Sequence, residues 1–273
     1  MTNIRRTERV LLGAVFTMEA GGSVIFALMG NLQDEFGFND GGLGLIAAAG
    51  FLASFVMQIV VAPYADRGHA KRLLIIATVL ALVGNALFAA GSSLIVFIVA
   101  RLVAGAGSGL FLPPARALIA SLDEKGVSER LGAMGGVALA GFVTGPVIGG
   151  FLVGPLGLRW PFIIFSISAL ISLMIVSTQR LPLLIPSTHP QRLAFGLLRQ
   201  RRVLVPILFL TSLALPVGMY DALWDRYLTD LGASDIVVGL SLAAYALPFV
   251  LLSRFGGRLA DRSGKIKIAF IAV

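Results

Sequence analysis

The sequence predicts an all-α protein that crosses a lipid bilayer several times. Of its 273 residues, 57% are hydrophobic and only 13% are charged, whereas soluble domains carry about 25% charged residues to keep their surface hydrated. The charged residues gather in short clusters between apolar runs of about twenty residues, the helix length that a hydrocarbon core about 30 Å thick requires. The composition therefore excludes a water-soluble globule.

Eight apolar runs are long enough to cross a bilayer. They cover residues 10–31, 42–64, 73–92, 94–119, 131–154, 160–178, 203–225 and 235–256. A ninth run opens at Ile266 and reaches Val273 before it is long enough to span. We therefore expect a polytopic membrane protein whose chain is truncated at its C-terminal end.

The longest connection separates the first six spans from the last two. It covers residues 179–202 and is rich in proline and then in arginine, as expected of a boundary. Its second half, residues 190–202, suits either a short amphipathic helix on an anionic leaflet or an ordinary basic loop. We expect a six-span bundle over 1–178, a linker over 179–202 and a partial second bundle over 203–273.

Lysine and arginine mark one side of the membrane. They precede the first span and follow every even-numbered span, whereas the alternate loops hold few positive charges. Basic loops stay on the cytoplasmic side. The pattern predicts a multi-pass protein of the plasma membrane with a cytoplasmic N-terminus and a cytoplasmic linker.

Two loops six spans apart share an Ala-Asp-Arg core. The first contains Asp66 and Arg67, and the second contains Asp261, Arg262 and Gly264. A repeat in equivalent loops indicates two halves related by an axis along the membrane normal, an architecture of secondary transporters.

The second loop resembles the signature Gly-x-x-x-Asp-Arg-x-Gly-Arg-Lys of the major facilitator superfamily. The first loop matches it in part, because Ala62 and His69 replace its glycines. Span 4 is similar to the family's Arg-x-x-x-Gly pattern at Arg101 and Gly105. Span 5 resembles the signature Gly-x-x-x-Gly-Pro-x-x-Gly-Gly of the family's antiporters, with Gly141, Gly145, Pro146, Gly149 and Gly150 at its fixed positions.

This resemblance extends over nearly the whole chain and implies a transporter. Members of the family move a small molecule by rocking two halves about a central cavity. The resemblance also implies that the full-length protein acts as a monomer. It also implies that the loops carrying Asp66 and Asp261 act as gates.

Three of the span 5 glycines form one stripe. Gly141, Gly145 and Gly149 are four residues apart, so another helix backbone can approach them closely. The resemblance favours a seam that seals against the opposite half of the transporter. Ordinary packing of small residues is the alternative.

The loop carboxylates suit contacts with the start of a helix. A carboxylate accepts N–H bonds there and complements the helix dipole. By pseudo-symmetry Asp261 is expected to meet the start of span 5, whereas the counterpart of Asp66 would lie in an eleventh span, beyond Val273.

Ionisable residues inside spans are functional candidates by default. Glu19 lies in span 1, Arg101 in span 4 and Asp221 near the outer end of span 7. Because spans 1 and 4 line the cavity in the family that this chain resembles, we expect Glu19 to carry a proton and Arg101 to tune it. A static buried pair of Glu19 with Arg101 is the alternative. Asp225 is expected to be an interfacial charge.

Several classes of protein are disfavoured by what the sequence lacks. It has no cysteine and two histidines far apart in loops, so we expect no metal site and no cofactor. It shows no catalytic triad and no phosphate-binding loop, so an enzyme and an ATP-driven pump are not expected. Its basic residues are dispersed, which speaks against a nucleic-acid partner.

The predicted function is proton-coupled efflux of a small organic substrate through the bilayer. Proton-coupled uptake of a sugar or another metabolite is the nearest alternative, since the same architecture serves both directions. A non-transporting membrane protein on the same scaffold is the third possibility, because fold does not dictate function.

Overall fold

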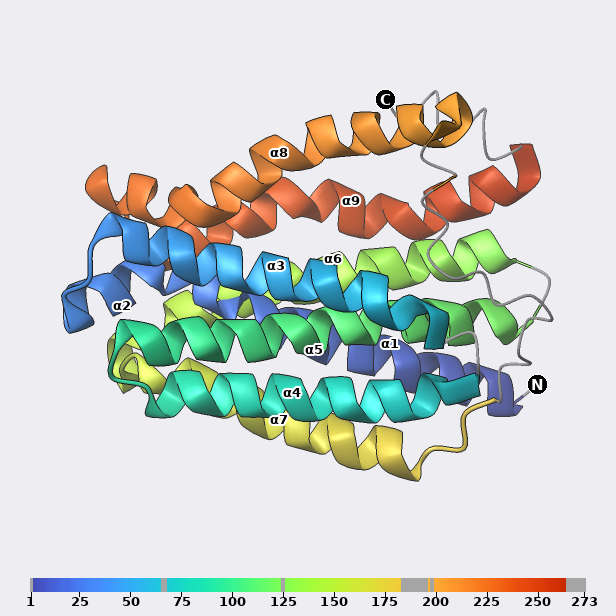
Figure 1. Ribbon diagram of the computed structural model, residues 1–273, viewed down its shortest axis with the longest axis horizontal. Helices are drawn as coiled ribbons and strands as arrows, with labels where there is room; N and C mark the ends of the chain where they lie inside the picture. Colours follow the sequence, from blue (N-terminus) through green and yellow to red (C-terminus); the bar gives the residue numbers. More distant parts are fainter. Residues whose placement is uncertain (1, 65–67, 124–125, 183–195, 197–198, 264–273) are drawn as a thin grey trace.

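The computed structural model describes residues 2–64, 68–123, 126–182, 196 and 199–263, some of them by backbone alone. The regular elements of this part are all helical (Figure 1). They are α1 (Thr2–Ser23), the 3₁₀ helix η1 (Val24–Ala27), α2 (Met29–Phe36), α3 (Asp40–Tyr64), α4 (Ala70–Ala90), α5 (Leu94–Ser121), α6 (Val127–Leu156), α7 (Arg159–Thr178), α8 (Arg201–Asp230) and α9 (Asp235–Ser263). The all-α prediction is confirmed.

The helices are long enough to cross a membrane. Six stretches of the described residues, from Ile4–Ala27 to Arg159–Thr178, combine sufficient length with high hydropathy. Helices α8 and α9 have 30 and 29 residues, which also exceeds the length that a span requires. Large apolar side chains face outward along these helices, such as Phe55 at 62% and Ile95 at 74% exposure. This outer surface suits lipid.

The first span is not the continuous helix that its apolar run predicted. After Ser23 the helix tightens into η1, and after Leu28 it resumes as α2. Leu28 N donates to Ile25 O at 3.0 Å, the spacing of a 3₁₀ turn. Backbone groups that such a break leaves unpaired need other partners inside a bilayer. Side chains of α5 and α8 supply two of them, as described below.

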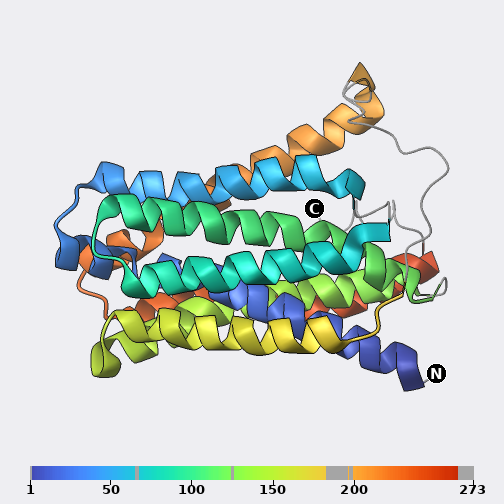
Figure 2. The same cartoon turned by 60° about the horizontal axis from the view of Figure 1, so that its bottom comes forward.

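The helices run side by side, and their connections lie at two ends (Figures 1 and 2). Helix α5 packs against α3 and α4, α7 against α4, and α6 lies between α1 and α9. In Figure 1, α8 and α9 lie along one side of the assembly and α7 lies along the other. We call the end at which α1 begins the basic end, because several described arginines, among them Arg5, Arg130 and Arg202, belong to helix ends there, and the other end the distal end.

Apolar side chains fill the bundle in two clusters. The distal cluster contains a row of rings in which Phe88 stacks on Phe97 and Phe162, with centroids 6.0 and 5.0 Å apart. The second cluster, toward the basic end, includes Leu11, Leu74 and Phe111. The polar residues considered next lie between and beyond these clusters.

Candidate functional site

The glycine stripe of α6 packs against α1 and η1. A Cβ atom added to Gly141 would lie 2.5 Å from Phe16 O, one added to Gly145 would collide with Ala20 O, and one added to Gly149 would lie 3.2 Å from Val24 Cγ2. Both series advance by four residues, so the two helices are in contact over two turns. The stripe therefore meets the first span of the same bundle, and not the opposite half that the resemblance favoured.

A second face of α6 meets α9. Gly150 lies against Asp235 O, Gly132 against Ser253 O, and Gly239 of α9 against Pro146 O. The expected contact with the opposite half is thus made by Gly150 and by the backbone at Pro146. Because α6 presents small residues on two faces, it packs closely on both sides.

Glu19 lies at the contact between α1 and α6. It is half-buried, and its Cβ lies 3.1 Å from the position of a Cβ added to Gly141. Arg116 of α5 contributes a long-range electrostatic interaction with its carboxylate, and the two side chains form no ion pair with each other. Arg116 was not predicted from the sequence, although an arginine three residues before the expected end of an apolar span was a visible signal.

Arg101 is buried, with 6% exposure, and is directed at the break in the first span. Its Nη1 donates to Gly22 O at 2.6 Å, and its guanidinium carbon lies 4.7 Å from the centre of the Phe26 ring. Gly22 is in the last turn of α1, where carbonyl groups lack partners in their own helix. Arg101 therefore stabilises the C-terminal end of α1 inside the bilayer. Its predicted role in tuning Glu19 stays a prediction.

Gly105, four residues from Arg101, has a packing role. A Cβ on Gly105 would collide with Gly50 O of α3, and one on Gly50 would collide with the Arg101 side chain. The Arg-x-x-x-Gly pattern thus allows α3 and α5 to approach closely while Arg101 passes between them.

The basic end carries a polar cluster that joins α6 to α9. Glu129 Oε1 accepts from Arg254 Nε at 3.1 Å and from Arg258 Nη2 at 2.8 Å. Asp261 Oδ2 accepts from Glu129 N at 3.0 Å, so the predicted contact of Asp261 with the start of this helix is present. We call Glu129, Arg254, Arg258 and Asp261 the basic-end latch.

Of the other four predicted gating residues, the structure describes one. Arg262 is exposed at the end of α9. Asp66, Arg67 and Gly264 lie outside the described residues, as does most of the second half of the linker. Sequence reasoning missed Glu129, although an acidic residue in the first turn of a helix is a usual N-terminal signal.

The distal end carries a second polar contact between the six-helix bundle and α8. Asp225 has 4% exposure, and its Oδ2 accepts from Gly30 N, at the start of α2, at 2.9 Å. Arg226 bridges Asp34 of α2 at 3.5 Å and Asp230 at 3.0 Å. Asp225, expected to be an interfacial charge, is thus covered by α2 at the distal end. The side chain of Asp221 lies outside the described residues.

Comparisons with known proteins point to one family. Residues 11–273 match the Major Facilitator Superfamily. The chain is 26% identical to multidrug resistance protein MdtG of Proteus mirabilis, over 93% of this chain and 66% of that protein. It is 24% identical to quinolone resistance protein NorA of Staphylococcus aureus, over 81% of this chain and 58% of that protein. It is 26% identical to multidrug resistance protein 2 of Bacillus subtilis, over 60% of this chain and 41% of that protein.

The chain thus spans between 41% and 66% of the length of these three relatives. Among solved structures, it is similar to a bacterial homolog of the human lysosomal transporter Spinster in an inward-facing, unoccupied conformation. The TM-score is 0.71 at 18% identity, over 96% of this chain and 64% of that one. At this identity the likeness concerns the fold. The helix order, the two glycine faces of α6 and the family match lead to one conclusion: the chain belongs to the Major Facilitator Superfamily.

Proposed function

We propose that this protein is a secondary transporter that exports small organic molecules in exchange for protons by alternating access. Three relatives named for drug resistance support export and an organic substrate. Family membership favours a transporter over an enzyme and over a scaffold without transport activity. Proton-coupled uptake remains the competing direction.

The observation that carries the proposal is the position of Glu19. It is the only carboxylate within the first six predicted spans. In the structure it is half-buried at the α1–α6 contact, with Arg116 acting on it from α5. Burying a carboxylate inside a bilayer costs free energy. Carboxylates that nevertheless occur there are typical of proton relays in transporters. Glu19 is therefore the proposed proton carrier, Arg116 its charged partner and Arg101 the residue that holds the first span.

The two polar contacts support alternating access. The basic-end latch joins α6 to α9, and the Gly30–Asp225 bond joins α2 to α8 at the other end. Each contact links the six-helix bundle, residues 1–178, to the proposed second bundle that begins at 203. We propose that transport breaks one contact at a time, so that the cavity opens to one side only.

A test of the function uses the intact protein in vesicles with an imposed pH gradient. We expect a quinolone, taken from the name of one relative, to move against its concentration gradient when the proton gradient is present. Movement that depends on the proton gradient but runs in the direction of the proton would establish uptake instead. No movement of a panel of organic cations, quinolones and sugars would favour a scaffold without transport.

The proposed orientation has its own test. The arginine-rich loops favour a cytoplasmic N-terminus for the protein in a plasma membrane. Reporters fused after Lys125 and after Arg199 should be cytoplasmic, and reporters fused after Asp40 and after Asp230 should be external. Two fusions on the wrong side would overturn this topology.

The basic-end latch predicts a change in accessibility. Glu129→Gln keeps the shape of the side chain and removes the charge that holds Arg254 and Arg258. Because these arginines are exposed, each ion pair contributes little to stability. In the background Ser128→Cys, whose position lies at the α6–α9 contact, we expect thiol labelling to become about two- to fivefold faster. The chain has no native cysteine.

The matched control for this experiment is Glu8→Gln. Glu8 lies on α1, outside the latch. If both substitutions change the labelling rate equally, Glu129 contributes only general charge, and the latch has no specific function.

A further inference from the structure

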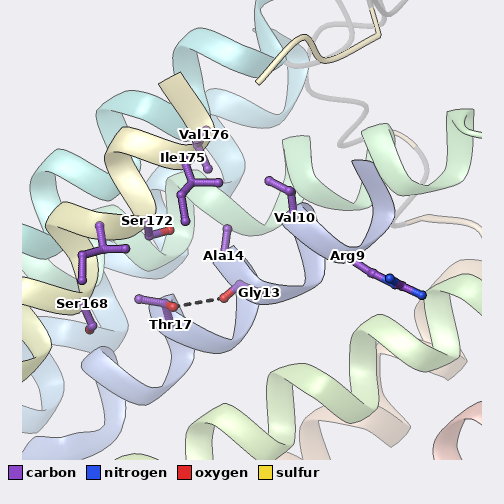
Figure 3. Close-up of a pocket in the computed structure, with 10 residues that line it drawn as sticks. Arg9, Val10, Gly13, Ala14, Thr17, Ser168, Ser172, Ile175 and Val176 are labelled. Atoms are coloured by element: carbon purple, nitrogen blue, oxygen red, sulfur yellow. Dashed lines mark hydrogen bonds between the residues drawn. The ribbon is translucent and has the colours of Figure 1, made fainter. Parts of the chain in front are cut away.

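A groove of about 400 Å³ lies between α1 and α7, toward the basic end (Figure 3). Its volume falls in the range of ligand pockets. In Figure 1, α7 lies on the side of the bundle away from α8 and α9, so the groove is separate from the face on which the second bundle packs. Two lining residues, Ile171 and Ile175, are 48% and 46% exposed. The groove therefore opens toward lipid.

Small residues form the floor of the groove. Helix α1 contributes Gly13, Ala14 and Thr17, and α7 contributes Ser168 and Ser172. A Cβ atom added to Gly13 would meet nothing within 4 Å. Glycine at this position is therefore not required for contact between helices, unlike Gly141 or Gly145 of α6.

One hydroxyl group in the groove has a hydrogen-bonding capacity that the described residues do not use. Thr17 Oγ1 donates to Gly13 O at 3.0 Å, and Ser168 Oγ donates to Phe165 O at 2.9 Å. Ser172 is 6% exposed, and its Oγ has no hydrogen-bond partner in the described part of the chain. In Figure 3 this hydroxyl points from α7 toward α1. A buried polar group without a partner indicates a missing acceptor or donor.

Basic residues of α1 lie near one end of the groove. Arg5, Arg9, Gly13 and Thr17 are four residues apart and share one face of α1. Arg5 and Arg9 are exposed, and neither forms an ion pair with another residue that the structure describes. The Arg9 guanidinium is turned away from the groove in Figure 3, and rotation of its long side chain brings it to the entrance.

We propose that this groove binds one anionic glycerophospholipid from the leaflet at the basic end. Arg9 binds the lipid phosphate, Ser172 Oγ donates to an ester carbonyl, and an acyl chain lies along Gly13, Ala14 and Ile175. Ser172 faces Ala14, which is five residues from Arg9, or about 7.5 Å along the helix axis. A phosphate and an ester carbonyl of one lipid can bridge this spacing.

The test measures lipid binding to the whole chain in detergent by native mass spectrometry. The probes are dioleoylphosphatidylglycerol, which is anionic, and dioleoylphosphatidylcholine, which is not. We expect Gly13→Leu, which fills the groove, to weaken binding of the anionic lipid at least about tenfold. Its control is Gly154→Leu in α6, a position where an added Cβ also meets nothing within 4 Å.

Two further substitutions separate the parts of the site. Ser172→Ala should weaken binding about two- to tenfold, as expected for one hydrogen bond. Its control, Ser166→Ala, removes a hydroxyl group that already donates a hydrogen bond to Phe162 O. Arg9→Gln should weaken binding of the anionic lipid about fivefold and leave binding of the zwitterionic phosphatidylcholine unchanged. Unchanged helix content and elution volume establish that each variant is folded.

Three results would overturn the proposal. The first is equal binding of the anionic lipid by Gly13→Leu and Gly154→Leu. The second is equal binding of both lipids by the unsubstituted chain, or displacement of the anionic lipid by inorganic phosphate, which would leave an anion site without an acyl-chain groove. The third is crosslinking of Gly13→Cys into dimers, which would assign the groove to a second copy of the chain.

Discussion

Glu19→Gln should reduce proton-driven substrate movement to the level of protein-free vesicles while substrate binding survives. Glutamine keeps the size and much of the hydrogen bonding of glutamate but cannot take up or release a proton. The side chain lies beside Gly141, where α6 approaches α1 closely, so an isosteric change avoids a packing defect. The measurement is uptake into reconstituted vesicles with and without a pH gradient, together with substrate binding to the purified protein.

The control for Glu19→Gln is Glu35→Gln. Glu35 is exposed in α2, so its neutralisation changes net charge equally without touching the span. If Glu19→Gln still responds to the pH gradient at the unsubstituted rate, Glu19 is structural and the proton site lies elsewhere. Asp225, which is buried against Gly30, is then the next carboxylate to test.

Gly145→Leu should have the second large effect, a loss of coupled transport in a protein that still inserts. Even a Cβ at this position would collide with Ala20 O and Ser23 Oγ and would lie 2.9 Å from Val24 N. These are mostly backbone atoms, which cannot move aside as a flexible side chain can. Overpacking of this kind costs about 1–3 kcal/mol or more, and it separates α6 from the first span.

A smaller substitution allows a matched comparison: Gly145→Ala, at a close helix contact, and Gly135→Ala, at an open position of the same helix α6. A Cβ on Gly135 meets nothing within 4 Å, so that substitution should leave transport unchanged and favour the helix slightly. We expect Gly145→Ala to lower the melting temperature by several degrees and to slow transport. If Gly145→Ala and Gly145→Leu both transport normally, the glycine stripe is not a close contact in the working protein.

The spans could be predicted because apolar length is a local property of the sequence. Their ends could be placed only to within a few residues. The run at 203–225 became α8, which extends from Arg201 to Asp230. A helix continues into the interface as long as its backbone groups bond to one another, whatever the polarity of its side chains.

The break at η1 was not predicted, although Gly21, Gly22 and Ser23 directly precede it and glycine weakens a helix. Residues 24–27 are Val-Ile-Phe-Ala, with no proline or glycine. The partners of the groups beside the break are distant in sequence: Arg101 lies 79 residues from Gly22, and Asp225 lies 195 residues from Gly30. A single sequence does not reveal which distant side chain will meet which backbone group.

In the candidate site, too, the residues that a sequence motif marks could be predicted. Asp261 was found because its loop carries a repeated motif, and pseudo-symmetry gave its partner. Glu129 and Arg116 have no motif, and their importance depends on the neighbours that folding gives them. Asp225 is buried because α2 covers it, and α2 is distant from Asp225 in the sequence.

The 3₁₀ turn in the first span also sets how far α2 can rotate. A 3₁₀ helix advances about 2.0 Å and 120° per residue, whereas an α-helix advances about 1.5 Å and 100°. Rewinding the four residues of η1 into α-helix would shorten the span by about 2 Å and turn α2 by roughly 80°. Gly30 and Asp34 would then swing away from Asp225 and Arg226. The distal contact can thus open by local winding of one helix, without moving the bundle as a rigid body.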